Sequence, residues 1–245
     1  MEFPLKKTTA LKMTALNPRS YGQRRLVFQF LSFISAIFLF ALANPAAAQD
    51  KLILALGDSL TAGYQLKPAE SFPAQLQTAL QKEGRKVRVH NAGVSGDTTA
   101  QGKARLNWVL ASLKQKPDLA IVALGANDML RGQPPAQARA NLDAILTELN
   151  KRGIPVVLAG MLAAPNMGTA YAKEFNAIYP TLAKKHGATL YPFYTQGVTA
   201  NPKLLLADGM HPNAAGVGVM VKNILPTVRK ALDVPGVRKA PDTKK

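Results

Sequence analysis

The 245-residue chain contains no cysteine, three histidines and one tryptophan. Without cysteine it can form neither disulfides nor thiolate metal sites, so its stability must come from packing. Three histidines leave little scope for a metal centre built on imidazole. The single Trp108, which we expect in the core, leaves few aromatic platforms on which bases could stack. These shortages argue against disulfide scaffolds, thiolate metalloproteins and aromatic nucleic-acid modules.

Acidic residues are also few: 14 Asp and Glu stand against 31 Lys and Arg, which gives a formal net charge of +17. Such an excess favours anionic partners, among them membrane headgroups, acidic polysaccharide and nucleic acid. The basic residues are dispersed along the chain, so nucleic acid is not predicted as a partner. We expect weak attraction to an anionic membrane or envelope surface, with a merely soluble basic surface as the alternative.

The first 48 residues have the pattern of a secretory signal peptide. Six Lys and Arg precede an apolar run over residues 26–43, and Ala46-Ala47-Ala48 follows this run. We therefore predict cleavage after Ala48 and a periplasmic or secreted mature protein. The apolar run is about long enough to span a bilayer, so an uncleaved anchor is the alternative.

From residue 52 onward, short apolar segments alternate with amphipathic ones. The apolar segments are rich in Leu, Ile and Val, as buried strands are, and they cover residues 52–56, 87–90, 119–124, 154–159 and 188–191. Apolar residues at helical spacing predict the intervening helices, including one continuous helix through Tyr171 and Leu182 and a last helix from Asn213 to Leu232. Several end at glycines suited to left-handed caps, namely Gly84, Gly153 and Gly187.

This alternation predicts an α/β fold with three layers: a doubly wound, five-stranded parallel sheet of flavodoxin-like order 2-1-3-4-5. We predict one domain over residues 49–232 and a basic, disordered tail over residues 233–245.

Four segments at strand ends or in a late loop carry groups that acyl transfer requires. The groups are a hydroxyl, a backbone N–H, a side-chain amide and an Asp–His pair. Because the carboxyl ends of parallel strands share one edge of a sheet, the four segments should meet there. They are Gly57-Asp58-Ser59-Leu60, Asn91-Ala92-Gly93, Gly125-Ala126-Asn127-Asp128 and Asp208-Gly209-Met210-His211-Pro212.

Only four serines follow residue 48. Ser71 and Ser112 are expected to be capping or solvated hydroxyls. Ser95 lies in a strand-end loop and competes with Ser59, which could itself be only a helix cap. No Gly-x-Ser-x-Gly elbow occurs, which argues against the usual α/β-hydrolase design.

His211 is the best candidate for a general base. Asp208 precedes it by three residues and could accept from Nδ1, leaving Nε2 for the serine proton. His90 and His186 are expected to be structural. The remaining groups have two readings each: Gly93 could permit a turn or offer its N–H to an oxyanion, and Asn127 could tie loops together or donate to the same oxyanion.

Together these segments resemble the sequence blocks of the SGNH, or GDSL, hydrolases, over residues 51–232. They are most similar to the bacterial periplasmic thioesterase I, lysophospholipase and arylesterase group, which Phe175-Asn176-Ala177-Ile178-Tyr179-Pro180 also resembles. The resemblance implies a Ser59–His211–Asp208 triad and an oxyanion hole formed by the N–H groups of Ser59 and Gly93 and the Asn127 side chain. It implies no metal or organic cofactor. Asp58 and Asp128 are expected to hold loop backbone.

The function expected is that of an exported serine esterase acting on small ester or lipid substrates, such as aryl esters, acyl thioesters or lysophospholipids. The sequence does not determine the oligomeric state, for which a monomer is favoured. A polysaccharide O-acetyl esterase and a non-catalytic envelope-binding protein are the alternatives. Apolar residues of neighbouring loops are expected to line the acyl cleft: Met129, Leu130, Met161, Leu162, Pro165 and Met167. Met167 stands where relatives often carry an aromatic residue, and Gln101 where a glycine is expected.

Overall fold

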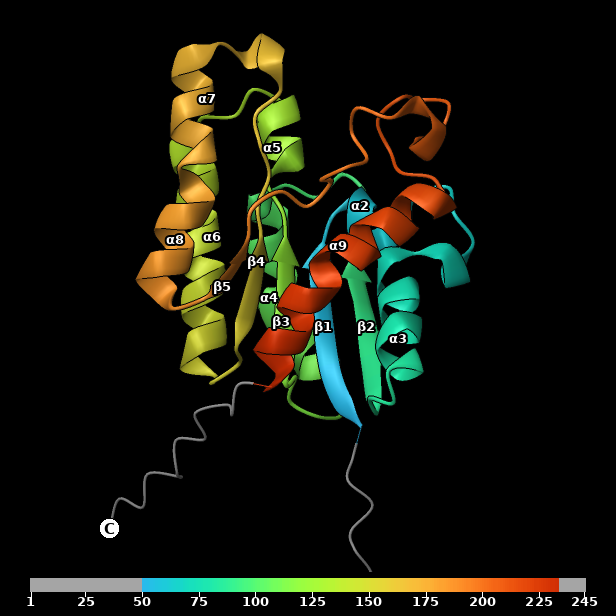
Figure 1. Ribbon diagram of the computed structural model, residues 1–245. Coiled ribbons are helices and arrows are strands. Elements are labelled where there is room, and N and C mark those ends of the chain that lie inside the picture. The colour runs from blue at the N-terminus through green and yellow to red at the C-terminus, as the bar shows by residue number, and fades with distance from the viewer. Residues whose placement is uncertain (1–49, 234–245) are drawn as a thin grey trace, which may run out of the picture. The chain divides into compact units, whose positions relative to one another are not determined.

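A five-stranded parallel sheet forms the centre of the computed structural model, which describes residues 50–233 (Figure 1). The strand order is β2-β1-β3-β4-β5 and every neighbouring pair is parallel, which confirms the predicted doubly wound sheet. The predicted signal peptide and basic tail lie outside the described residues, apart from Asp233. The strands are β1 (Lys51–Gly57), β2 (Val87–Gly93), β3 (Leu119–Ala123), β4 (Val156–Ala159) and β5 (Thr189–Tyr191).

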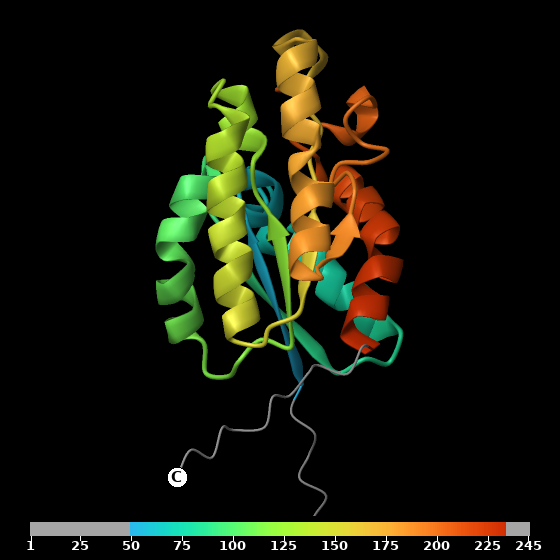
Figure 2. The same ribbon diagram turned by 90° about the vertical axis from the view of Figure 1, so that its left-hand side faces the viewer.

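Helices cover both faces of the sheet (Figures 1 and 2). Alternate residues of a strand point to opposite faces, so Leu54 and Leu56 pack in one hydrophobic cluster and Ile53 packs in the other. The first cluster lies under α4 (Thr99–Ser112), α6 (Pro135–Lys151) and α8 (Ile178–His186). The second lies under α3 (Phe72–Lys82) and α9 (Ala214–Asp233). None of the helices in residues 50–233 has the length and apolarity needed to cross a bilayer.

Short helical segments follow the carboxyl ends of the strands, at the upper edge in Figure 1. These segments carry much of the site described below. They are α2 (Ser59–Ala62), α5 (Ala126–Leu130), α7 (Thr169–Asn176) and the 3₁₀ turns η1 (Pro68–Glu70), η2 (Pro165–Met167) and η3 (Pro202–Leu204).

The structure corrects two sequence-based predictions. The single helix through Tyr171 and Leu182 is in fact two, α7 and α8, which meet at Ala177. Pro180 explains the break, because proline has no N–H to donate to the carbonyl four residues earlier and its ring crowds that carbonyl.

Trp108 is not in the core: its exposed fraction is 74%. The buried side of α4 is taken by Leu106, Val109 and Leu110, and position 108 falls on the opposite side of the helix. The glycine caps were predicted correctly, since Gly84, Gly153 and Gly187 all have positive φ.

Candidate active site

Ser59 is the first residue of α2, immediately after β1 and the sharp turn at Asp58. The Asp58 carboxylate accepts a hydrogen bond from the Leu60 N–H at 3.0 Å and so fixes the start of this helix. Ser59 Oγ lies 3.0 Å from His211 Nε2, although 152 positions separate the two residues in the chain. The fold therefore brings the predicted nucleophile and base into hydrogen-bond contact.

Asp208 and His211 lie together on a hairpin turn, which is closed by a hydrogen bond from Leu206 N to His211 O of 2.7 Å. Asp208 Oδ2 is 2.7 Å from His211 Nδ1. Its other oxygen accepts the backbone N–H groups of Met210 and His211, both at 2.9 Å. These backbone hydrogen bonds, His211 first, together with the contact to the imidazole, lower the pKa of Asp208 to about 2. The carboxylate is thus ionised at neutral pH and can orient the imidazole.

The Tyr64 ring packs against the His211 imidazole, with 4.4 Å between ring centroids and 36° between ring planes. Tyr64 follows Gly63, the left-handed cap of α2. Gln65 has a φ of 56° and is the only non-glycine residue with positive φ among residues 50–233; its side chain donates to the Tyr64 hydroxyl at 3.2 Å. Such strained backbone is typical of functional sites. The sequence reasoning missed Tyr64, and the Gly63-Tyr64 pair was the available signal.

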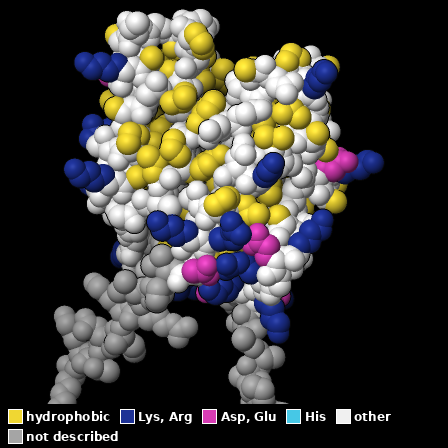
Figure 3. Space-filling view, in the orientation of Figure 1, with side chains coloured by type: hydrophobic (Ala, Val, Ile, Leu, Met, Phe, Trp, Pro, Cys, Tyr) yellow, Lys and Arg dark blue, Asp and Glu magenta, His cyan; other side chains and the backbone are white. Residues whose placement is uncertain are grey.

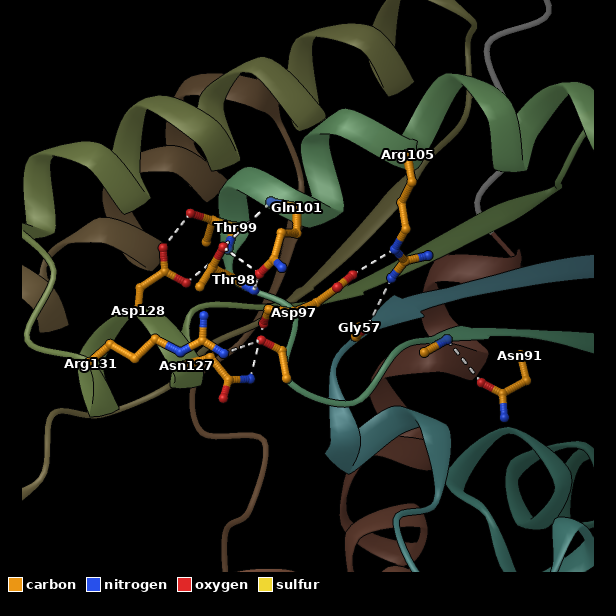
Figure 4. A network of polar contacts seen from close by, with 12 residues as sticks. Gly57, Asn91, Asp97, Thr98, Thr99, Gln101, Arg105, Asn127, Asp128 and Arg131 are labelled. Carbon is orange, nitrogen blue, oxygen red and sulfur yellow. Dashed lines mark hydrogen bonds and ion pairs between the residues drawn. The ribbon is translucent and has the colours of Figure 1, made fainter.

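Asn127 lies in the first turn of α5 and borders the same cleft as Ser59 and His211. One N–H of its side chain donates to Asp97 O at 3.0 Å (Figure 4). An amide nitrogen carries two hydrogens, so the second remains for a ligand. The side chain is therefore held by one hydrogen bond and can donate another.

Gly93 does not occupy the position that the sequence analysis gave it. Its N–H donates to Asn91 Oδ1 at 3.0 Å, a hydrogen bond drawn in Figure 4. Gly93 is not among the residues that line the cleft. A Cβ at this position would meet Ala62 N at 2.3 Å, so glycine is needed for the close packing of β2 against α2. This arrangement corrects the predicted oxyanion hole.

Gly96, three residues further along, has the properties expected of Gly93. It lines the cleft, has a φ of 87°, and no hydrogen bond within residues 50–233 uses its N–H. Its carbonyl accepts from Arg131 Nη2 at 2.8 Å, which holds the loop. The sequence reasoning missed Gly96 because Gly93 and Gly96 occur in one short loop, and sequence alone does not show which N–H is free.

The other serines are less well placed to act as nucleophiles. Ser95 also lines the cleft, but no hydrogen bond in the part of the chain that the structure describes joins it to a histidine. Ser71 Oγ donates to Pro68 O, and Ser112 Oγ donates to Val109 O, so both are structural as expected.

Neither of the other histidines approaches the cleft. His186 Nε2 lies 2.6 Å from Asp143 Oδ1 and joins α8 to α6, while His90 belongs to β2.

Three aspartates near the nucleophile are buried, namely Asp58, Asp97 and Asp128, and Figure 4 shows the network of polar contacts around the last two. Asp97 pairs with Arg105 Nε at 2.6 Å, and the same guanidinium donates to Gly57 O at 3.0 Å. Asp128 accepts from the N–H and hydroxyl of Thr99 at 2.8 and 2.6 Å. Asp58 and Asp128 thus hold backbone, which confirms that prediction.

Among the three aspartates, Asp58 has the charge that its surroundings stabilise least. Burial, opposed in part by the hydrogen bond from Leu60 and reinforced by the charges of Asp97 and Asp128, raises the pKa of Asp58 to about 7.

Gln101, the residue that departs from the expected glycine, also has a structural role. Its side-chain oxygen accepts from the N–H of Thr98 at 2.9 Å and completes the capping box of α4.

Apolar side chains form one wall of the cleft, whose volume is about 660 Å³. Met167 does not line the cleft; it packs against the hydrophobic cluster under α4, α6 and α8, because η2 turns it toward that layer. The other five residues predicted to contact the acyl chain do line it: Met129, Leu130, Met161, Leu162 and Pro165.

Comparison with known proteins gives relatives over most of the described chain. An arylesterase from Vibrio mimicus is 40% identical over 182 residues, covering 74% of this chain and 90% of that protein. Thioesterase 1/protease 1/lysophospholipase L1 from Escherichia coli K12 is 41% identical over 178 residues, covering 72% of this chain and 82% of the relative.

Solved structures and a family profile agree with these relatives. The crystal structure of AlinE4, an SGNH-hydrolase family esterase, is 50% identical with a TM-score of 0.65, and the match covers 78% of this chain and all of that one. The profile of the GDSL-like lipase/acylhydrolase family matches residues 55–219, which include Ser59, Asn127 and His211. The chain, a carboxylic ester hydrolase, therefore belongs to the GDSL-like lipase/acylhydrolase family.

Proposed function

We propose that the protein hydrolyses carboxylic esters through an acyl-enzyme formed on Ser59, with His211 as general base and Asp208 as the residue that orients it. One observation carries this proposal: Ser59 Oγ, His211 Nε2, His211 Nδ1 and Asp208 Oδ2 form a continuous chain of contacts of 3.0 and 2.7 Å at an apolar cleft. A nucleophile within hydrogen-bond reach of an oriented base is what acyl transfer requires.

In the first half-reaction, His211 Nε2 takes the hydroxyl proton while Ser59 Oγ bonds to the substrate carbonyl carbon. The carbonyl oxygen becomes an oxyanion. When the tetrahedral intermediate collapses, the bond to the leaving alcohol or thiol breaks and His211 returns the proton to the leaving group. In the second half-reaction, water attacks the acyl-enzyme in the same way and releases the carboxylic acid and free Ser59.

Three donors are available to the oxyanion: the N–H groups of Ser59 and Gly96, and the second N–H of the Asn127 amide. Donors fixed before the reaction stabilise charge without reorganising. Asn127→Ala should therefore lower kcat by about 10²–10³-fold with a smaller change in KM. A change confined to KM would instead make Asn127 a substrate-binding residue.

We further propose aryl esters, acyl thioesters and lysophospholipids of short to medium chain as substrates. The names of the two relatives, an arylesterase and a thioesterase/lysophospholipase, support these classes. The apolar wall that includes Met129, Met161 and Leu162 also favours an acyl chain over acetate alone. A chain-length series of esters, thioesters and lysophospholipids tests this, and acetate release from polysaccharide without activity on longer chains would favour an O-acetyl esterase.

We also propose that the protein is exported and that residues 1–48 are removed. The basic and apolar pattern of that segment and the Ala-rich exit at Ala46–Ala48 support it. N-terminal sequencing of protein from the cell envelope should give Gln49 as the first residue, whereas retention of residues 1–48 would indicate an anchor.

Ser59→Ala is the decisive variant for the catalytic role. It should abolish turnover of p-nitrophenyl esters and labelling by a fluorophosphonate probe. Ser95→Ala is the matched control because Ser95 lines the same cleft without contacting His211. Normal turnover by Ser59→Ala, or loss of labelling only in Ser95→Ala, would overturn the assignment.

A further inference from the structure

Large hydrophobic side chains that remain exposed are concentrated around the mouth of the cleft. Only six such side chains occur in residues 50–233. Four of them line the cleft, and a fifth, Val94, directly precedes Ser95, which also lines it. The sixth, Trp108, lies on α4 outside the cleft. We refer to the first five as the cleft rim: Tyr64 (38% exposed), Val94 (45%), Leu130 (50%), Leu162 (45%) and Met210 (53%).

Each residue of the cleft rim comes from a different strand-to-helix connection. Tyr64 follows β1, Val94 follows β2, Leu130 follows β3, Leu162 follows β4 and Met210 follows β5. The carboxyl edge of the sheet thus receives one exposed apolar side chain from every strand. Single exposed apolar residues are ordinary, but apolar residues gathered at one place on the surface mark a contact site.

The charges beside the cleft rim are mainly basic. Arg131 is exposed and donates to Gly96 O at the cleft, and Lys203 is exposed in the connection that also carries Met210. The carboxylates nearby are already engaged: Asp97 is buried and paired with Arg105, and Asp208 binds His211. In the connection between β1 and α3, the opposite charges of Lys67 and Glu70 cancel.

On the face shown in Figure 3, basic side chains outnumber acidic ones, and they occur at both ends of the molecule with the most crowding at the lower end. The acidic side chains of Glu83, just after α3, and Asp233, at the end of α9, both pair with Arg85. The whole chain has an excess of basic residues, with a formal net charge of +17, which favours an anionic partner. Charge therefore favours an anionic surface for the molecule as a whole, and the exposed apolar side chains of the cleft rim determine which end docks.

We propose that the cleft rim docks on an anionic phospholipid bilayer, so that the cleft opens directly onto the lipids. Apolar side chains from five connections would enter the interface while Arg131 and Lys203 meet the headgroups. Apolar contact and attraction between opposite charges are the two contributions that bind proteins to membrane surfaces. The inference rests on the proposed function only for the lipid nature of the substrate, since docking does not require hydrolysis.

Trp108 provides an internal reference. It lies nine residues into α4, about 13 Å along the helix from its first residue at the carboxyl edge. Its exposed fraction, 74%, is larger than that of any residue of the cleft rim. If exposure of apolar surface were sufficient for binding, Trp108 would contribute most; if the cleft rim docks, Trp108 should contribute nothing.

The test is co-sedimentation with vesicles of phosphatidylglycerol and phosphatidylcholine, using the inactive Ser59→Ala protein so that lipid is not consumed. Val94→Ser combined with Leu162→Ser should lower the partition coefficient about tenfold, because both side chains lose their apolar contact. Lys203→Gln should weaken binding relative to the parent protein, and this difference should grow as salt is lowered. Trp108→Ser, the matched control in the same protein preparation, should bind like the parent.

A fluorescence experiment tests independently which part of the protein faces the vesicle surface. In the parent protein, emission from Trp108 should not change when the vesicles are added. In a Trp108→Phe background, Leu162→Trp should shift to shorter wavelength with the same vesicles. Equal binding to pure phosphatidylcholine, unchanged binding of the Val94–Leu162 double variant, or weakened binding of Trp108→Ser would each overturn the proposal. Normal ester turnover by the wild type in any of these cases would show that the proposed function stands without docking.

Discussion

The nucleophile and the base are held by two very different parts of the molecule. Behind Ser59, the carboxylates of Asp58, Asp97 and Asp128 are buried, with exposed fractions of 1%, 5% and 0%. Asp208, which supports His211, is exposed in a hairpin between β5 and α9. The same residue type therefore fixes backbone on one side of the site and orients an imidazole on the other.

Because of this difference in surroundings, Asp58 and Asp208 have very different pKa values. Burial raises the pKa of Asp58 to about 7, whereas backbone N–H groups lower the pKa of Asp208 to about 2. A carboxylate that must stay charged to orient an imidazole is thus placed in a solvated turn with donors around it. The buried side gives rigidity at the cost of an unfavourable charge, and the exposed side gives a stable charge with few packing contacts.

The largest expected effect is a loss of activity when Asp208, on the exposed side of the site, is substituted. Asp208→Asn keeps the shape of the side chain but removes the charge and presents an amide donor to Nδ1 of His211, so kcat should fall by about 10⁴-fold. Because Asp208 is exposed, the melting temperature should change little. Steady-state kinetics and thermal melting measure the two quantities. A large loss of stability with near-normal kcat would reverse the assigned roles of the two sides.

The next effect is on the pH dependence of stability. The pKa of Asp58 is 3.8 in a model peptide and about 7 in the fold, so the folded state binds more protons between these values. The Asp58 contribution should therefore lower the free energy of unfolding as pH rises from about 4 to 7, by up to about 1.4 kcal/mol per pH unit. Asp208 acts in the opposite direction, since its stabilisation is present above pH 3.8 and is lost as pH falls toward 2.

Urea unfolding at pH 5 and pH 8 tests this contribution of Asp58. Asp58→Asn, which stays neutral, should lose less stability than the wild type between the two pH values. Equal losses in the two proteins would contradict the raised pKa of Asp58.

A third effect concerns the buried network alone. Asp128→Ala leaves the N–H and hydroxyl of buried Thr99 without their acceptor and should lower the free energy of unfolding by about 3 kcal/mol. Asp143→Ala is a suitable control, because that aspartate also accepts several hydrogen bonds but lies at the surface, with 32% of its side chain exposed. Denaturant unfolding should show the larger loss for Asp128→Ala. Equal losses would mean that burial is not what distinguishes the network.

The smallest expected effect concerns Tyr64, which connects the nucleophile side of the site to His211. Tyr64 belongs to the turn after α2 and touches His211 with its ring. Tyr64→Leu should lower kcat several-fold, since the imidazole loses the aromatic contact that restricts its orientation. Tyr64→Phe keeps the ring and should retain most of the activity. If Tyr64→Phe is as impaired as Tyr64→Leu, the hydroxyl and its contact with Gln65 would be responsible instead.

Regular structure was predictable because it depends on local sequence patterns, and the approach of Ser59 to His211 was predictable because it follows from the fold. Buried strands appear as runs of Leu, Ile and Val, and the meeting of Ser59 with His211 follows from the edge that parallel strands share. The oxyanion donor was not predictable in the same way. Gly93 and Gly96 differ in where their N–H groups point, and that depends on Asn91 and on the approach of α2.

Two further differences also arise from packing rather than composition. Trp108 was expected in the core because it is large and aromatic, but the phase of α4 places it in solvent. Met167 was grouped with the acyl cleft because it is an apolar residue of a neighbouring loop, yet η2 turns it into the hydrophobic layer. Neighbours in sequence can face opposite sides of a turn, so proximity along the chain does not assign a side chain to a cleft.

The hairpin that carries Asp208 and His211 is complete in itself. Leu205 and Pro212 form an antiparallel bridge, Leu206 bonds to His211, and both oxygens of Asp208 are satisfied within the turn. Within residues 50–233, its sole hydrogen bond to the nucleophile joins His211 Nε2 and Ser59 Oγ. The acid–base pair is therefore oriented by residues 205–212 as one cassette, whereas the connection before it is part of the core, because Tyr194 and Val198 are buried there.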